Sequence, residues 1–191
     1  MDPIERASKL RQEADFVLQQ VKVYDILRPH GTIVPTGSYF LDVMAYPDID
    51  LYLSKVSIDQ LFDIGAQLAK CDMVFRVEFE KSDEPRLPGG LYLKPRIAYG
   101  DWGRPWKIDI WSLDDQVIER LMQPMWHFQS KMTAQLREQI IRYKFSVMTK
   151  LDRPPMYSGY FIYKAFIDEG MTEFHQVTAY LIANGIRMEL G

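Results

Sequence analysis

Cysteine is nearly absent from this sequence. Cys71 is the single cysteine among 191 residues, so no disulfide can form within the chain, which fits a reducing cytoplasm. Histidine is also scarce, and the three histidines are scattered without metal-ligand spacing. These absences argue against a disulfide-stapled scaffold and against a metal site built from cysteine and histidine.

Long apolar runs and a strong net charge are missing too. No stretch approaches membrane-spanning length, and the first segment, MDPIERASKL, is charged and lacks the apolar core of a signal peptide. The formal net charge of -3 argues against a protein that coats long nucleic acid, because such proteins present a basic face. We therefore expect a cytoplasmic protein with neither a membrane partner nor a long nucleic-acid partner.

Apolar residues, by contrast, are plentiful at 47% of the chain, and no internal repeat or low-complexity tract is present. The length suits one well-cored domain, or a small domain with a helical appendage. The spacing of the apolar residues mixes helices with period-two strands at first and is helical afterwards. It predicts helices over residues 3–28, 38–45, 57–71, 114–123, 133–151, 158–170 and 172–185, and strands over 32–36, 48–54, 73–80, 91–99 and 106–113.

These elements predict an α+β fold. We expect a mixed sheet with flanking helices over residues 1–113, followed by a helical C-terminal bundle over residues 114–191. Ser57 and Gln60 form a capping-box pattern at the start of the helix over 57–71. Thr172 is a suitable first cap for the last helix, and Gly185 a suitable stop.

Two carboxylates stand on alternate residues of the predicted strand DIDLYLS. In a strand, Asp48 and Asp50 point to one face, while Ile49 and Leu51 point to the other. Like charges so close repel, and burial raises the cost further. A divalent cation between them makes the placement favourable, and Mg²⁺ prefers oxygen ligands. We therefore predict that Asp48 and Asp50 bind Mg²⁺.

A third aspartate, Asp109, lies in the apolar strand WKIDIWSL. If this strand neighbours the first one in a single sheet, Asp109 joins Asp48 and Asp50 on the same face. Three carboxylates around one point suit a two-metal site, in which one metal activates a hydroxyl and the other holds phosphates. These three aspartates are the candidate catalytic and metal-binding residues.

A Gly-Ser pair precedes the acidic strand. Gly37 allows backbone N–H groups to approach a phosphate closely, and Ser38 can donate a hydrogen bond and begin a short helix. The N-terminus of that helix, with its partial positive charge, would point at the same phosphate. We therefore expect Gly37 and Ser38 to contact a nucleotide.

This ordered set of motifs resembles the signature of the polymerase-beta-like nucleotidyltransferase superfamily. The set consists of TGS, DIDLYL after nine intervening residues, and later KIDIW. The resemblance implies transfer of a nucleoside monophosphate from a nucleoside triphosphate, with release of pyrophosphate. It also implies that Asp48 and Asp50 bind both metals, that Asp109 binds the catalytic metal and helps to deprotonate the acceptor hydroxyl, and that Gly37 and Ser38 hold the β- and γ-phosphates.

One feature departs from that pattern. Many small bacterial members carry a basic residue in the helix after Gly-Ser, whereas this chain has the acidic Asp42 there and no base. Lys144 and Lys164 each interrupt an apolar helical face, so each either reaches out to solvent or meets a phosphate. We take both as candidate nucleotide-binding residues. Lys107 and Lys55 flank the acidic strands and could simply balance their charge.

Two functions remain open at this point. The first is an Mg²⁺-dependent nucleotidyltransferase acting on a hydroxyl of a small-molecule or protein acceptor, and the modest acidity of the chain favours a small or basic acceptor. The second is a non-catalytic regulatory or antitoxin-like protein on the same fold, because a fold does not fix a function. Asp-x-Asp and Gly-Ser pairs also occur in ordinary strand ends and turns, so the whole ordered set carries the first hypothesis.

Overall fold

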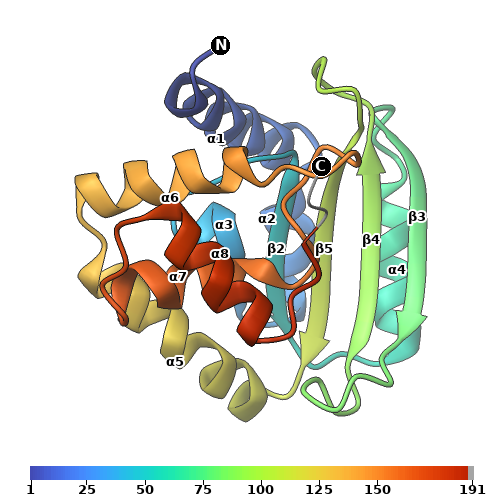
Figure 1. Cartoon of the computed structure of the whole chain (residues 1–191). Coiled ribbons are helices and arrows are strands. Elements are labelled where there is room, and N and C mark those ends of the chain that lie inside the picture. The colour runs from blue at the N-terminus through green and yellow to red at the C-terminus, as the bar shows by residue number, and fades with distance from the viewer. Residues whose placement is uncertain (189–191) are drawn as a thin grey trace.

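A five-stranded mixed sheet lies at the centre of the computed structural model, which describes residues 1–188 (Figure 1). The strand order is β1-β2-β5-β4-β3. β2 and β5 run parallel, and the other neighbouring pairs are antiparallel. The predicted strands are confirmed to within two residues at each end, and their bounds are β1 Ile33–Thr36, β2 Asp48–Ser54, β3 Val74–Lys81, β4 Leu91–Ile97 and β5 Trp106–Leu113.

The helices of the first half break more often than the sequence predicts. They are α1 Pro3–Gln20, α2 Val23–Leu27, the 3-10 turn η1 Arg28–His30, α3 Gly37–Phe40 and α4 Ile58–Leu68. A single helix over 3–28 is wrong, because Lys22 adopts a left-handed conformation at φ 57° and redirects the chain. The break allows Val23 and Leu27 to be fully buried in the core. The capping box of Ser57 and Gln60 is present.

The short helix after Gly-Ser is also shorter than predicted. Only the turn Gly37–Phe40 forms, because Asp42 takes a left-handed φ of 55°. The Arg137 side chain donates to the Asp42 carboxylate over 2.8 Å and holds the chain in this bend. The acidic residue noted in the sequence therefore pairs with a helix of the second half.

The second half contains α5 Asp115–Lys131, α6 Ala134–Ser146, α7 Ser158–Ile167 and α8 Phe174–Ala183. The predicted end of the first of these at residue 123 is wrong, because α5 continues through Pro124. Met122, Met125 and Phe128 continue its buried stripe beyond that point, and this packing outweighs the hydrogen bond lost at proline. α8 begins one residue later than predicted, with Glu173 as its cap instead of Thr172.

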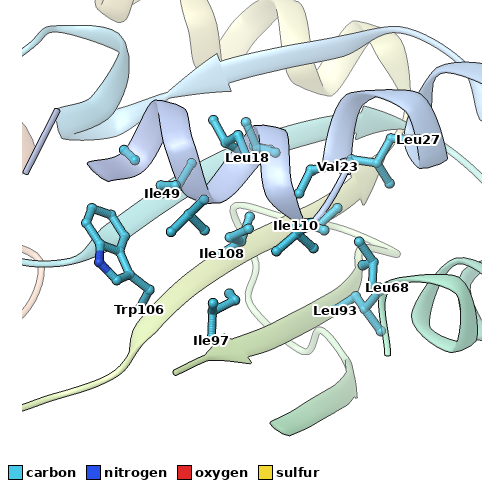
Figure 2. Close-up of a cluster of buried hydrophobic side chains, with 14 of the residues drawn as sticks. Leu18, Val23, Leu27, Ile49, Leu68, Leu93, Ile97, Trp106, Ile108 and Ile110 are labelled. Atoms are coloured by element: carbon cyan, nitrogen blue, oxygen red, sulfur yellow. The ribbon is translucent and has the colours of Figure 1, made fainter. Parts of the chain in front are cut away.

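Two apolar cores result. The first lies between the sheet and helices α1, α2 and α4, and Figure 2 shows Ile108 and Ile110 of β5 within it, together with Ile49 of β2. The second lies among α5–α8, which gather beside β2, away from the β3 edge (Figure 1). It also includes Val43 and Leu113 from the first half. The α+β class with a helical second half is thus confirmed.

The boundary between residues 113 and 114 coincides with the end of β5. Its status as a domain boundary stays a prediction, because the second core draws residues from both sides of it. Within residues 1–188, none of the helices combines the length and the apolar character needed to span a membrane.

Candidate metal and nucleotide site

The structure brings Asp48, Asp50 and Asp109 together on one face of the sheet. The parallel register sets Asp50 opposite Asp109, and strand alternation turns Asp48 to the same side. One carboxylate oxygen from each residue lies within 4.8 Å of the others. The alternate residues Ile49 and Ile108 point into the first core. The roles of the three aspartates in metal binding and catalysis stay predictions.

The donor set fits a divalent cation. All three side chains offer carboxylate oxygens, the ligands that Mg²⁺ prefers. Oδ1 of Asp48 is buried, and Nζ of Lys107 lies 2.8 Å from it, so a cation already occupies the place beside this oxygen. The residues present are therefore suitable ligands for a metal ion in this position.

Lys107 contacts two of the three acids. Its Nζ lies 2.8 Å from Oδ1 of Asp48 and 2.5 Å from Oδ2 of Asp109. Burial alone lowers the pKa of Lys107, but the charges of the three acids outweigh burial and raise that pKa above its ordinary value. The ammonium therefore stays charged, and it balances part of the acidic charge, as its place beside the acidic strand suggested.

Tyr92 on β4 supports Asp109 from the other side. Its hydroxyl donates to Oδ1 of Asp109 over 2.6 Å, and its ring stacks on Trp111 with centroids 4.3 Å apart. Both oxygens of Asp109 therefore have partners, Oδ1 in Tyr92 and Oδ2 in Lys107. This contact of Tyr92 cannot be predicted from the sequence, because it depends on the pairing of β4 with β5.

Desolvation and neighbouring carboxylates raise the pKa of Asp50 and that of Asp109. Burial raises the pKa of Asp50 well above its ordinary value, and the charges of Asp48 and Asp109 raise it further. Burial likewise raises the pKa of Asp109, with a further contribution from Asp48, although Lys107 and Tyr92 act in the opposite direction. Within residues 1–188, Asp50 has no ion pair. It is therefore the least compensated of the three carboxylates.

Gly37 packs directly against the acidic strand. Its φ is +63°, and a Cβ at this position would lie 2.3 Å from Oδ2 of Asp50. Only glycine suits such a conformation and such a close approach. Gly37 and the buried Ser38 line the same cavity as the acids, as the sequence predicts for a phosphate-contacting pair.

Lys144 of α6 reaches into this region from the helical half. It is 3% exposed, and its Nζ donates to the carbonyl of Val43 over 2.7 Å. Burial lowers the pKa of Lys144 to about 7, although Asp48 and Asp50 act to raise it. An amine that is about half charged near pH 7 thus lines the same cavity as the Gly-Ser segment, which lacks a base of its own. Lys164, the other candidate, is not among the described residues that line the cavity.

The acids open into a cavity of about 680 Å³ between the sheet and the helices, within the usual range for a small-molecule site. Sequence analysis missed several of its polar residues, because they come from segments without a motif. Ser158, at the start of α7, is 1% exposed, and its Oγ has no hydrogen-bond partner within the described residues. Three arginines also line the cavity, namely Arg86, Arg120 and Arg153.

Comparisons with known proteins were made at three levels. No protein-family model matches the sequence, and no curated protein matches it. The solved structure of the poly(A) polymerase complex GLD-2–GLD-3 matches with a TM-score of 0.50 and 16% identity, covering 91% of this chain and 61% of the other. The Cid1 poly(U) polymerase bound to MgGTP matches with a TM-score of 0.45 and 16% identity, covering 75% of this chain and 43% of the other.

This chain spans 43% and 61% of the lengths of these two matched chains. At 16% identity, the GLD-2 likeness establishes the fold and no more. The chain therefore shares the fold of the matched chain in the poly(A) polymerase complex, which is the nucleotidyltransferase-like fold that its motifs predicted.

Proposed function

We propose that this protein transfers a nucleoside monophosphate from a nucleoside triphosphate to a hydroxyl of a small-molecule or protein acceptor, with Mg²⁺ as cofactor. One observation carries the proposal: three carboxylates lie within 4.8 Å of one another in a cavity that also contains the Gly37–Ser38 turn. Such an arrangement is costly for a purely structural site, because buried like charges repel. Binding of a divalent cation would offset that cost.

In the proposed reaction, the acceptor oxygen forms a bond to the α-phosphorus. The bond between that phosphorus and the oxygen bridging to the β-phosphate breaks, and pyrophosphate leaves with the bond's electron pair. The hydroxyl proton passes to solvent or to the Asp109 carboxylate, once Lys107 has left that carboxylate. Mg²⁺, when bound, would neutralise phosphate charge and make the acceptor hydroxyl more acidic.

The residues of this chain would divide the remaining work. Asp48, Asp50 and Asp109 would hold the metal ions. Gly37 and Ser38 would hold the phosphates beyond the α-phosphate, as proposed from the sequence. The buried amine of Lys144 and the hydroxyl of Ser158, which has no hydrogen-bond partner within the described residues, line the same cavity and would add donors to the triphosphate. We do not extend this role to Lys164.

The cavity lining bears on the acceptor. Among the described residues that line it, the carboxylates are the three metal-site aspartates, whereas Arg86, Arg120 and Arg153 are cations. A polyamine would find no further acid to pair with there. The lining thus supports an acceptor with an anionic or aromatic group over the basic acceptor suggested by overall charge. The net charge of -3 still supports a small acceptor over a long nucleic acid, and the single cysteine supports a cytoplasmic location.

A second candidate function rests on Lys107. Because its ammonium contacts Asp48 and Asp109 directly, a protein that binds nucleotides without metal and without turnover is also compatible with this geometry. Such a regulatory protein would bind a nucleoside triphosphate equally well with and without Mg²⁺. Calorimetric titration of ATP, GTP, CTP and UTP with and without Mg²⁺ separates the two candidates, since the transferase requires the metal.

The direct test is incubation of the full chain with each labelled triphosphate and a panel of hydroxyl acceptors. We expect a mass gain of one nucleotide on an acceptor, together with pyrophosphate release. The matched control is the exposed Asp114→Asn variant, which removes a carboxylate that pairs with Lys55 outside the cavity. Absence of any adduct and of pyrophosphate across the panel, together with metal-independent nucleotide binding, would favour the regulatory function.

A further inference from the structure

Lys107 belongs to the same sheet face as the acids that it contacts. It stands opposite Asp48 in the β2–β5 register and two residues before Asp109 on β5. Its side chain is 15% exposed, and those of Asp48 and Asp109 are 5% and 13% exposed. The two acids, more than water, therefore solvate the ammonium. Such shielded contacts are stronger than ion pairs on the surface.

Lys107 contacts an oxygen of Asp109 that a divalent cation would need. Tyr92 already donates to Oδ1 of Asp109, which leaves Oδ2 as the oxygen available to a metal, and Lys107 contacts that atom. A divalent cation binds its oxygen ligands at roughly 2.0–2.6 Å, too close for an ammonium on the same side of both carboxylates. The two ion pairs of Lys107 and metal binding by Asp48 and Asp109 therefore exclude one another.

The free-energy cost of displacing the Lys107 ammonium depends on which charged groups surround it after it leaves the two acids. Among the described residues that line the cavity, no fourth carboxylate is present to receive it. Beside a bound metal, the ammonium would face a like charge across a few Å in a buried site. A nucleoside triphosphate changes this balance, because its phosphate oxygens supply the anionic partners that the displaced ammonium has lost.

We propose that Lys107 makes metal binding at Asp48 and Asp109 depend on the nucleotide, by pairing with these acids until a triphosphate takes over the ammonium. This inference rests on the proposed function, since it requires acids that bind a divalent cation and a triphosphate that enters the same cavity. Lys107 is in this account a positioning residue. It moves from the acids to the phosphates, and metal and nucleotide bind with positive coupling.

The test compares metal binding by the full chain and two variants in chelator-treated buffer. Lys107→Met removes the ammonium and keeps an apolar stem, and Lys55→Met removes a lysine that pairs with Asp114 outside the cavity. Mn²⁺ alone is titrated by calorimetry. We expect Lys107→Met to bind Mn²⁺ about tenfold more tightly than the parent, as coupling of this kind typically amounts to 5–150-fold. Lys55→Met should match the parent.

A second arm adds a non-hydrolysable triphosphate analogue at fixed free Mn²⁺ concentrations. The analogue should raise the Mn²⁺ affinity of the parent by a larger factor than that of Lys107→Met, because the variant has no ammonium to relocate. If Lys107 were merely structural, its loss would loosen the site, and the Mn²⁺ affinity of Lys107→Met would fall below that of the parent. Gain of affinity is thus the signature of the proposed role.

Equal or weaker Mn²⁺ affinity in Lys107→Met would overturn the inference and leave the proposed function standing. No Mn²⁺ binding by either protein, with or without the analogue, would overturn the proposed function itself. Circular dichroism checks the fold. If Lys107→Met does not fold, Lys107→Gln replaces it, because its amide donates to carboxylates without a charge, and the same gain in Mn²⁺ affinity is expected.

Discussion

The two faces of strands β2 and β5 are made from alternate residues of the same segments, yet opposite forces act on them. On one face, Ile108 and Ile110 are fully buried against helices α1, α2 and α4, and burial of apolar area stabilises the fold. On the other, Asp50 and Asp109 are held close together at an electrostatic cost, which Lys107 offsets only in part. The apolar residues that stabilise the fold and the acids of the candidate metal site are therefore separated by one residue along each strand.

The largest effect should follow from neutralising the acidic face. We expect Asp109→Asn to lower nucleotide transfer by roughly a thousandfold or more, the scale seen when a charge-stabilising group is lost from an active site. The fold should survive, because the amide keeps the shape of the carboxylate. Labelled-nucleotide transfer and circular dichroism measure the two properties. Activity equal to that of the parent would remove Asp109 from the mechanism.

The apolar face should respond in the opposite manner. Ile108→Ala leaves a cavity in a fully buried position, so we expect the free energy of unfolding to fall by about 2–5 kcal/mol. Mn²⁺ affinity of the folded fraction should stay close to that of the parent. Urea denaturation gives the first quantity and calorimetry the second. A large loss of Mn²⁺ affinity without a loss of stability would contradict the assignment of stability to this face and of metal binding to the other.

A smaller effect, of opposite sign, is expected at Asp50. Because this carboxylate is partly buried without an ion pair among the described residues, and its pKa is raised by desolvation and by its neighbours, Asp50→Asn should stabilise the protein in chelator by about 1 kcal/mol. In this variant, addition of metal should no longer raise the free energy of unfolding. The same gain is not expected at Asp48, because the Lys107 contact makes that acid a partner in an ion pair. Destabilisation by Asp50→Asn would show that this aspartate is structural.

The smallest effect is a proton taken up by Lys144. Its folded pKa of about 7 leaves this amine mostly neutral at about pH 8, and bound phosphates would raise that pKa, so nucleotide binding should draw a fraction of a proton from buffer. At about pH 6 the amine is already charged in the free protein, and uptake should vanish. Calorimetry in buffers of different ionisation enthalpy measures the uptake. Lys144→Met should abolish it, and unchanged uptake in that variant would assign the proton to another group.

The sequence predicts the strands of this site well, because their information is local. Period-two alternation locates Asp48–Ser54 and Trp106–Leu113 to the residue, and with them the shared face of the acids. The Gly37–Ser38 pair is likewise readable from a turn next to a strand. These features suffice for the fold and for the acidic cluster.

The remainder depends on tertiary contacts that no local pattern records. The break at Lys22 and the passage of α5 through Pro124 follow from core packing, which overrides local propensity. Arg153 lines the cavity from a loop and Ser158 from the start of α7, and neither segment carries a motif. Lys107 was noted only as balancing charge, because its contact with two acids requires the register between β2 and β5.

The contact between Gly37 and the acidic strand limits how this protein could be engineered. Since a single added carbon at residue 37 would collide with Oδ2 of Asp50, that position tolerates no side chain without shifting this carboxylate. A saturation library at this position should therefore yield glycine alone among clones that retain activity. Attempts to retune nucleotide choice would do better to diversify the arginines and aromatic residues at the cavity wall.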